Sequence, residues 1–394
     1  MSRNVGVISR GIRGPIIRPG DDLVQIVVDS VSNAVESDNI KLKDGDIIGI
    51  TEAVVAKAQG NYATLEQVSK DISQKFGNEV GIVFPIISRN RFSAVLKGIS
   101  MGVEKVYIQL SYPSDEVGNY LISQETLDNT DVNPYTDTLT EEDFARLFGK
   151  ANHQWTNVDY VELYKTICEG KATVIFSNDP KAMLKYTSHV LAADIHTRNR
   201  TKNILKKAGA EVVYGLDDVL SAPVNGSGYN PAYGLLGSNL STDNKLKLFP
   251  RDCDAFVKTV KSKIDEKFGV DINVLVYGDG AFKDPSAKIW ELADPVVSPG
   301  YTKGLSGTPN ELKLKYMIDT KLTGLSKDEA KAAMADLIHN KPTVNTTMES
   351  QGTTPRKIVD LVGSLCDLTT GSGDKGTPFV LIQGYFDNYA DEWI

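Results

Sequence analysis

Five short segments between residues 171 and 220 alternate in character, and this alternation constrains the fold more than any other feature of the sequence. The segments KATVIFSN, HVLAADIH and AEVVYG are strand-like, and DPKAMLKYTS and RTKNILKKAG between them are helical in character. Strands that alternate with helices form parallel sheets, because each crossover returns the next strand in the same direction. The pattern therefore predicts a small parallel βαβαβ unit in the middle of the chain.

The flanking regions predict further helices and strands. Asp21 or Asp22 can cap a helix that begins near Leu23, because the apolar residues that follow have helical spacing. Further helices are expected at about 65–76, 252–268, 326–339 and 355–366, and strands at about 46–51, 81–87, 103–113, 272–280 and 378–384. A chain of 394 residues is too long for one modest core. We therefore expect an α/β protein with two or more domains.

Composition excludes several classes of protein. The formal net charge of -8 argues against a general nucleic-acid binder, which would need concentrated basic surface. No apolar run approaches the roughly 18 residues needed to span a membrane. The three cysteines are far apart, so they suggest neither a disulfide framework nor a zinc site. We expect a cytoplasmic protein that binds neither nucleic acid nor membrane.

Two glycine-bearing loops lie near opposite ends of the chain. They are GPIIRPGDDL (residues 14–23) and TTGSGDKGTPFVLIQG (residues 369–384), and the second precedes an apolar run. Glycine lets successive backbone N–H groups turn toward one anion, so the second loop is typical of a phosphate site. A plain turn before a last strand is the alternative.

Four further segments accompany these loops in a fixed order: LKDGDIIGITEAVVAKAQG (residues 42–60), YPSDEVGN (112–119), VLVYGDGAFKDP (274–285) and PRKIVDLVGSLCDL (355–368). Together the six segments resemble the coenzyme F-420 γ-glutamyl ligases, which are GTP- and metal-dependent enzymes that add glutamate to a deazaflavin phospholactate tail. The resemblance is strongest over residues 11–60 and 355–384 and absent across roughly 121–250.

This resemblance implies an architecture of mixed sheets, of the α/β or α+β class. A ligase-like core would be formed by residues 1–120 and 251–394. Residues 121–250 would be an inserted βαβαβ subdomain with a mobile loop. The loop is 224–245, which is rich in Gly, Asn and Ser and has no clear period. A loop of this length is often an active-site cover. The resemblance also implies a homodimer.

The resemblance further implies which residues form the site. Asp115 and Asp279 would be catalytic metal ligands for Mg²⁺ or Mn²⁺, and Ser372 stands where the family has a metal-binding Gln. Glu116 and Asp284 are the alternatives to these two aspartates. Glu52 and Ala53 stand where the family has Ser-Lys, which puts part of the nucleotide site in question. The implied GTP-binding residues are Gly14, Pro15, Ile16, Ile17, Glu52, Lys57, Asn119, Thr370, Gly371, Ser372, Gly373, Asp374, Lys375, Gly376 and Thr377.

A separate group of side chains lies in HVLAADIHTRNR. Asp194 and His196 would point to the same face of a strand, with His189 before them and Arg198 after them. A metal or phosphate site is one interpretation, and a chance grouping of ligand-type residues is the other.

These observations favour an enzyme. The predicted activity is GTP-dependent, metal-assisted formation of an amide between L-glutamate and a carboxylate acceptor, through an acyl phosphate. The acceptor would be the F-420 precursor or a related molecule such as a folate. The alternative is a non-catalytic sensor or scaffold that keeps the fold and binds a nucleotide or metabolite.

Overall fold

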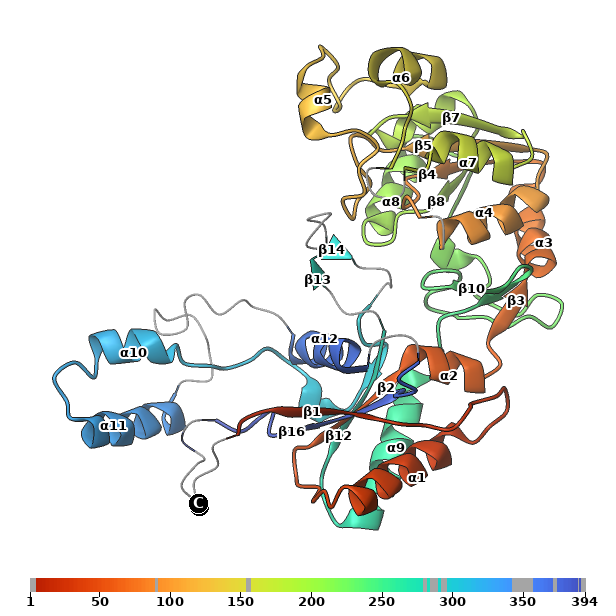
Figure 1. Ribbon diagram of the computed structural model, residues 1–394. Helices are drawn as coiled ribbons and strands as arrows, with labels where there is room; N and C mark the ends of the chain where they lie inside the picture. Colours follow the sequence, from red (N-terminus) through yellow and green to blue (C-terminus); the bar gives the residue numbers. More distant parts are fainter. Residues whose placement is uncertain are drawn as a thin grey trace.

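The computed structural model describes residues 5–88, 91–153, 157–278, 282–283, 290–291, 296–341, 357–370, 374–388 and 390. Two large sheets form its two main parts, with helices on both faces of each sheet (Figure 1). A smaller sheet lies between them in sequence and in the drawing. The arrangement confirms the expected mixed α and β class.

The first sheet is built from both ends of the chain. Its strands, in spatial order, are β1 (Ile8–Ile12), β16 (Phe379–Gln383), β2 (Ile47–Thr51), β12 (Asn273–Tyr277) and β15 (Gly300–Tyr301). β2 and β12 run parallel, and the other pairs are antiparallel. One face is covered by α1 (Leu23–Ser37) and α9 (Cys253–Phe268), and the other by α12 (Ile358–Thr370). The mixed sheet expected for the core is therefore present.

Helix α1 forms where the sequence predicts it. The carboxylate of Asp22 accepts a hydrogen bond of 3.0 Å from the backbone N–H of Gln25, which caps the first turn. Val27 and Val31 are fully buried against the first sheet, as their helical spacing requires.

The second sheet is mostly parallel. Its strands, in spatial order, are β6 (Leu139–Thr140), β7 (Ala172–Phe176), β5 (Lys105–Leu110), β4 (Glu79–Val83), β8 (His189–Ala192) and β9 (Val212–Gly215). One face packs on α3 (Leu65–Phe76), α4 (Phe92–Met101) and α7 (Tyr160–Ile167). The opposite face packs on the 3₁₀ helix η1 (Pro180–Lys185) and on α8 (Arg198–Lys207).

The elements of the predicted βαβαβ unit are present, but its strands are not consecutive in the sheet. β4 and β5 lie between β7 and β8, so only β8 and β9 are neighbours among the three strands. The predicted boundary at residue 120 therefore divides a single sheet, because residues 79–110 supply its two central strands. The larger change in packing comes before α3 rather than after β5.

The segment 224–245, expected as an aperiodic loop, is tied closely to its surroundings. It contributes β10 (Asn239–Thr242), which pairs with β11 (Lys245–Lys247) and, through it, with β3 (Tyr62–Thr64). The buried amide of Asn230 donates to the carbonyl oxygens of Phe249 and Pro250 at 3.1 and 3.0 Å. The short hairpin and the hydrogen bonds of Asn230 produce no periodic pattern of apolar residues. The sequence alone therefore does not indicate them. Mobility of this segment stays a prediction.

The remaining elements are shorter or peripheral. They are α2 (Glu52–Ala58), α5 (Gln124–Asp128), α6 (Glu141–Phe148), η2 (Leu216–Asp218), β13 (Phe282–Lys283), β14 (Trp290–Glu291), η3 (Lys303–Leu305), α10 (Leu314–Thr320) and α11 (Lys327–His339). Helices α10 and α11 extend to one side of the first sheet and share a small core of their own (Figure 1). None of the helices in the described ranges is long and apolar enough to cross a membrane.

Candidate functional site

A cavity of about 700 Å³ lies where β2 and β12 of the first sheet end. Both glycine-bearing loops contribute to it, together with the start of α2, the end of α12 and the hairpin of β10 and β11. We call it the glycine-loop cavity. Its lining from the two loops is Gly14, Pro15, Ile16, Ile17, Gly376, Thr377 and Pro378.

A direct hydrogen bond joins the two loops. The backbone N–H of Gly14 donates to the carbonyl oxygen of Gly376 at 3.1 Å. Gly376 has φ +63°, a conformation that glycine adopts at little cost. Gly14 packs so closely that a Cβ atom there would lie 2.9 Å from Phe379 Cε2 and from Pro378 Cγ. Both positions therefore depend on the absence of a side chain.

Helix α2 places opposite charges along one wall of the cavity. It begins directly after β2, so Glu52 lies in its first turn and Lys57 in its last. Glu52 is buried, whereas Lys57 is exposed. The helix dipole favours a negative charge at the first turn and a positive charge at the last, so both residues also stabilise the helix. Both side chains also line the cavity.

The end of α12 also lines the cavity. The hydroxyl groups of Thr370 and Tyr277 lie 3.1 Å apart, which links α12 to the end of β12. Burial raises the pKa of Tyr277 well above its ordinary value. The phenol is therefore protonated at neutral pH and holds this corner of the cavity without adding a negative charge.

The structure brings together most of the nucleotide-binding residues predicted from the sequence. Gly14 to Ile17, Glu52, Lys57, Thr370, Gly376 and Thr377 all line the glycine-loop cavity. Asp374 and Lys375 form the exposed turn just before Gly376 and are not among the lining residues that the structure describes. Gly371, Ser372 and Gly373 lie outside the described residues. The binding roles themselves stay predictions.

Asp115 has a different setting from the one that its predicted role suggests. It lies in the loop after β5 and is only 6% exposed. Its carboxylate accepts hydrogen bonds from the backbone N–H groups of Ile87, Val117 and Asn119 at 2.8 to 3.0 Å, and from the Asn119 side chain at 2.7 Å. Burial raises the pKa of Asp115, and these four donors oppose that shift.

This bonding occupies Asp115 with its own loop and with the segment before α4. Arg91, four residues after Ile87, lines the glycine-loop cavity. Asp115 thus ties its own loop to Ile87, and Asn119 donates to it through both its backbone and its side chain. Asp279 lies outside the described residues, so the predicted convergence of Asp115 and Asp279 stays a prediction. Among described residues, no group of three or more His, Cys, Asp or Glu is placed to hold a metal.

Some lining residues were not predicted from the sequence. Arg91, Asn239, Lys247 and Asp367 also line the glycine-loop cavity. Arg91, Asn239 and Lys247 come from elements outside the first sheet, so only the placement of the two parts of the molecule brings them here. Asp367 lies in the last turn of α12, two residues before the second glycine-bearing loop. Its place on the face of α12 is the signal in the sequence that could have indicated it.

A second cavity of about 690 Å³ lies beside the first. Three lysines contribute to it, namely Lys258 of α9, Lys303 of η3 and Lys357 just before α12. We call it the lysine cavity. His196 and Tyr233 line it from the side of the second sheet.

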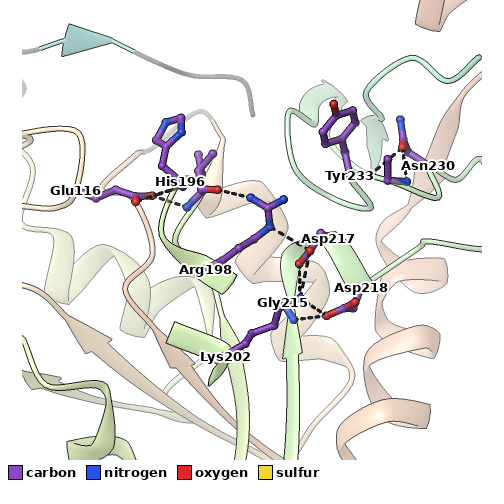
Figure 2. A network of polar contacts seen from close by, with 11 residues as sticks. Glu116, His196, Arg198, Lys202, Gly215, Asp217, Asp218, Asn230 and Tyr233 are labelled. Carbon is purple, nitrogen blue, oxygen red and sulfur yellow. Dashed lines mark hydrogen bonds and ion pairs between the residues drawn. The ribbon is translucent and has the colours of Figure 1, made fainter. Parts of the chain in front are cut away.

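A polar network fixes the segment that carries His196. The carboxylate of Glu116 accepts from the backbone N–H groups of His196 and Thr197, each at 3.3 Å. Figure 2 shows this contact beside the ion pairs of Arg198 and Lys202 with Asp217, at 3.1 and 3.2 Å. The rings of His196 and Tyr233 point away from these ion pairs, toward the same side of the picture.

The histidine group that the sequence singled out does not form a shared site. Asp194 accepts hydrogen bonds from the hydroxyl groups of Thr197 and Thr201 at 2.6 and 2.8 Å. His189 Nδ1 lies 2.7 Å from the carbonyl oxygen of Phe76, and the His196 side chain is exposed at the lysine cavity. The three side chains therefore have separate environments, which favours the interpretation as a chance grouping.

Comparison with known proteins identifies a family for this chain. The family model of F420-0:Gamma-glutamyl ligase matches residues 11–384. A Coenzyme F420:L-glutamate ligase from Methanothermobacter thermautotrophicus is 30% identical over 92 residues, which is 22% of this chain and 35% of that relative. The matched region thus spans about a third of the curated relative. Since the family match covers nearly the whole sequence, including both loops and α12, the chain belongs to the F420-0:Gamma-glutamyl ligase family.

Proposed function

We propose that this protein is a ligase that forms an amide bond between L-glutamate and a carboxylate acceptor, with GTP as the source of energy. The observation that carries the proposal is the hydrogen bond between Gly14 and Gly376, which holds both glycine-bearing loops at one cavity. A volume of about 700 Å³ lies within the range of small-molecule sites. The family membership supports glutamate as the amine.

The proposed reaction has two steps. An oxygen of the acceptor carboxylate attacks the terminal phosphorus of GTP, and GDP leaves. The amino nitrogen of glutamate then attacks the carbonyl carbon of the acyl phosphate, loses a proton and displaces inorganic phosphate. Phosphoryl transfer depends mainly on alignment and neutralisation of charge. In this cavity the Lys57 ammonium and the backbone N–H groups of the glycine-bearing loops would supply both.

A divalent metal is part of the proposal. The four hydrogen bonds to Asp115 leave it poorly suited as a ligand in this conformation. Glu52 and Asp367 bring carboxylates to the lining of the glycine-loop cavity, and Mg²⁺ prefers oxygen ligands of this kind together with phosphate. When bound there, Mg²⁺ or Mn²⁺ would offset the negative charge of the phosphates.

The proposed acceptor is the F-420 precursor or a related molecule such as a folate. The family membership supports the F-420 precursor. Glu52 and Ala53, which stand where the family has Ser-Lys, are the reason for including a related acceptor such as a folate. The homodimer likewise remains a proposal drawn from the resemblance.

The test is a reconstituted reaction. Purified protein is supplied with GTP, Mg²⁺, L-glutamate and either the deazaflavin phospholactate or a folate, and phosphate release and product mass are measured. We expect phosphate release only when both the acceptor and glutamate are present. Lys57→Met should raise the Kd for GTP about tenfold or more, because it removes a charge from the phosphate site. The control Lys97→Met, on the exposed face of α4, should leave that Kd unchanged. GTP binding without turnover with either acceptor would instead support the sensor.

A further inference from the structure

The glycine-loop cavity and the lysine cavity are neighbours. Gly278 lines the first and Val297 lines the second. The backbone N–H of Gly278 donates to the carbonyl oxygen of Val297 at 2.8 Å, so one backbone hydrogen bond separates residues of the two linings. A ligand in the lysine cavity would therefore lie next to a nucleotide in the glycine-loop cavity.

The lysine cavity has a lining suited to an anion. Lys258, Lys303 and Lys357 are exposed and contribute three ammonium groups, against the two carboxylates of Asp254 and Asp360. Within the part of the chain that the structure describes, none of the three ammonium groups forms an ion pair with the protein. Their charges are thus available to a ligand, and the walls of a cavity strengthen such contacts relative to open solvent.

The size of the lysine cavity suits the larger of the two substrates that the proposed reaction requires. A volume of about 690 Å³ is typical of a ligand with several rings and is far larger than one amino acid needs. The aromatic rings of Tyr233 and Tyr301 also line it. Tyr233 is held edge-on against Phe249, with ring centroids 5.1 Å apart, so its position is fixed before a ligand arrives.

We propose that the lysine cavity binds the acceptor, a polyanionic carboxylate with a planar ring system, through Lys258, Lys303 and Lys357. The inference rests on the proposed ligase function, because only then must a carboxylate lie beside the terminal phosphate of the nucleotide. The lysines bind the anionic groups of the acceptor, and the junction at Gly278 and Val297 is where its reactive carboxylate meets the phosphate.

The test is equilibrium binding in the presence of excess GDP, which fills the glycine-loop cavity. Two probes are titrated: the deazaflavin phospholactate, followed by its fluorescence, and tricarballylate, a simple tricarboxylate, followed by calorimetry. The variant is Lys258→Glu with Lys357→Glu, which reverses two charges of the lining. The matched control is Lys267→Glu, because Lys267 lies nine positions along α9, about two and a half turns, and faces the opposite side of the helix.

We expect the double variant to bind the deazaflavin phospholactate at least about tenfold more weakly than the wild type, and the control to match the wild type. GDP affinity should be the same in all three proteins, which shows that the fold and the first cavity are intact. If the wild type binds tricarballylate in the same lysine-dependent way but not the deazaflavin, the acceptor of the proposed function is wrong and the lysine cavity stands. If neither probe binds, or the double variant binds both as the wild type does, the inference is overturned.

Discussion

Gly14 and Gly376 join loops from the two ends of the chain through a single backbone hydrogen bond of 3.1 Å. The contact requires that neither residue carry a side chain, for different reasons. At Gly376 the reason is the positive φ angle, and at Gly14 it is the close approach of Phe379 and Pro378. The geometry of the glycine-loop cavity thus depends on two separate steric conditions.

Gly14→Val should separate the loops. Its side chain would overlap Phe379 and Pro378, so the loop must shift and the backbone donors lose their arrangement. We expect GTP affinity in calorimetry to fall about tenfold or more, with a smaller effect on thermal unfolding. Gly6→Val is the control, because a Cβ atom at Gly6 meets nothing within 4 Å. Equal GTP affinity in both variants would show that the contact between the loops does not shape the nucleotide site.

Asp115→Asn should destabilise the protein. An amide has one acceptor oxygen, and its NH₂ group would face N–H donors that now bind a carboxylate. We expect the free energy of unfolding in urea to fall by about 3 kcal/mol, with little change in the exposed control Asp131→Asn. Unchanged stability together with lost Mn²⁺ binding would instead identify Asp115 as the metal ligand that the family resemblance implies.

Asp194→Asn should remove a loss of folding stability that grows as pH rises. Burial raises the pKa of Asp194, and the neighbouring Glu116 adds to this shift, while Thr197 and Thr201 oppose it. The folded state therefore binds the proton more tightly than the unfolded state. Hence the contribution of Asp194 to stability is greatest below its unfolded pKa and is lost as pH rises through its folded pKa.

The measurement is the free energy of unfolding of wild type and Asp194→Asn between pH 4 and pH 8. The difference should favour the variant increasingly as pH rises, by about 1.4 kcal/mol for each unit by which the wild-type pKa is raised. A difference that is flat with pH would mean that Asp194 titrates alike in both states.

Gly49→Ala should overpack the contact between β2 and α12. A Cβ atom at Gly49 would lie 2.5 Å from Cys366 Sγ and 3.3 Å from Tyr277 Cδ1. We expect a loss of about 2 kcal/mol in the free energy of unfolding. In a Cys366→Ala background the same change should cost less than about 1 kcal/mol, because the nearest clash is gone. The same cost in both backgrounds would mean that the sulfur is not the obstacle.

Local signals made part of the fold predictable. Helix α3 begins and ends where the sequence indicates, because Thr64 and Gln67 form a reciprocal capping box before a helical apolar pattern. The placement of β4 and β5 between β7 and β8 was not predictable in this way, since strand order depends on how distant segments pack. For the same reason the expected boundary at residue 120 falls inside the sequence of one sheet.

In the candidate site, too, some residues have local sequence signals and others depend on tertiary packing. Gly14, Lys57 and Gly376 were identified from glycine-bearing loops and from the family resemblance, and the structure places them at one cavity. Arg91 and Lys247 carry no local signal, because they reach the cavity only through the packing of the second sheet and the small hairpin sheet. The lysine cavity is likewise formed by residues from several elements, and no segment of the sequence contains its pattern.

The pairing of β1 with β16 has a consequence for the order in which the two large sheets can form during synthesis. Among the described strands, β1 (residues 8–12) pairs only with β16 (residues 379–383), which is synthesised much later. At roughly 5 to 20 residues per second, the N-terminal strand waits tens of seconds for that partner. The second sheet, drawn from residues 79–215, can form during this interval. A nascent chain therefore completes the glycine-loop cavity only after residues 376–383 have been made, and a product that stops before Gly376 lacks part of the cavity lining.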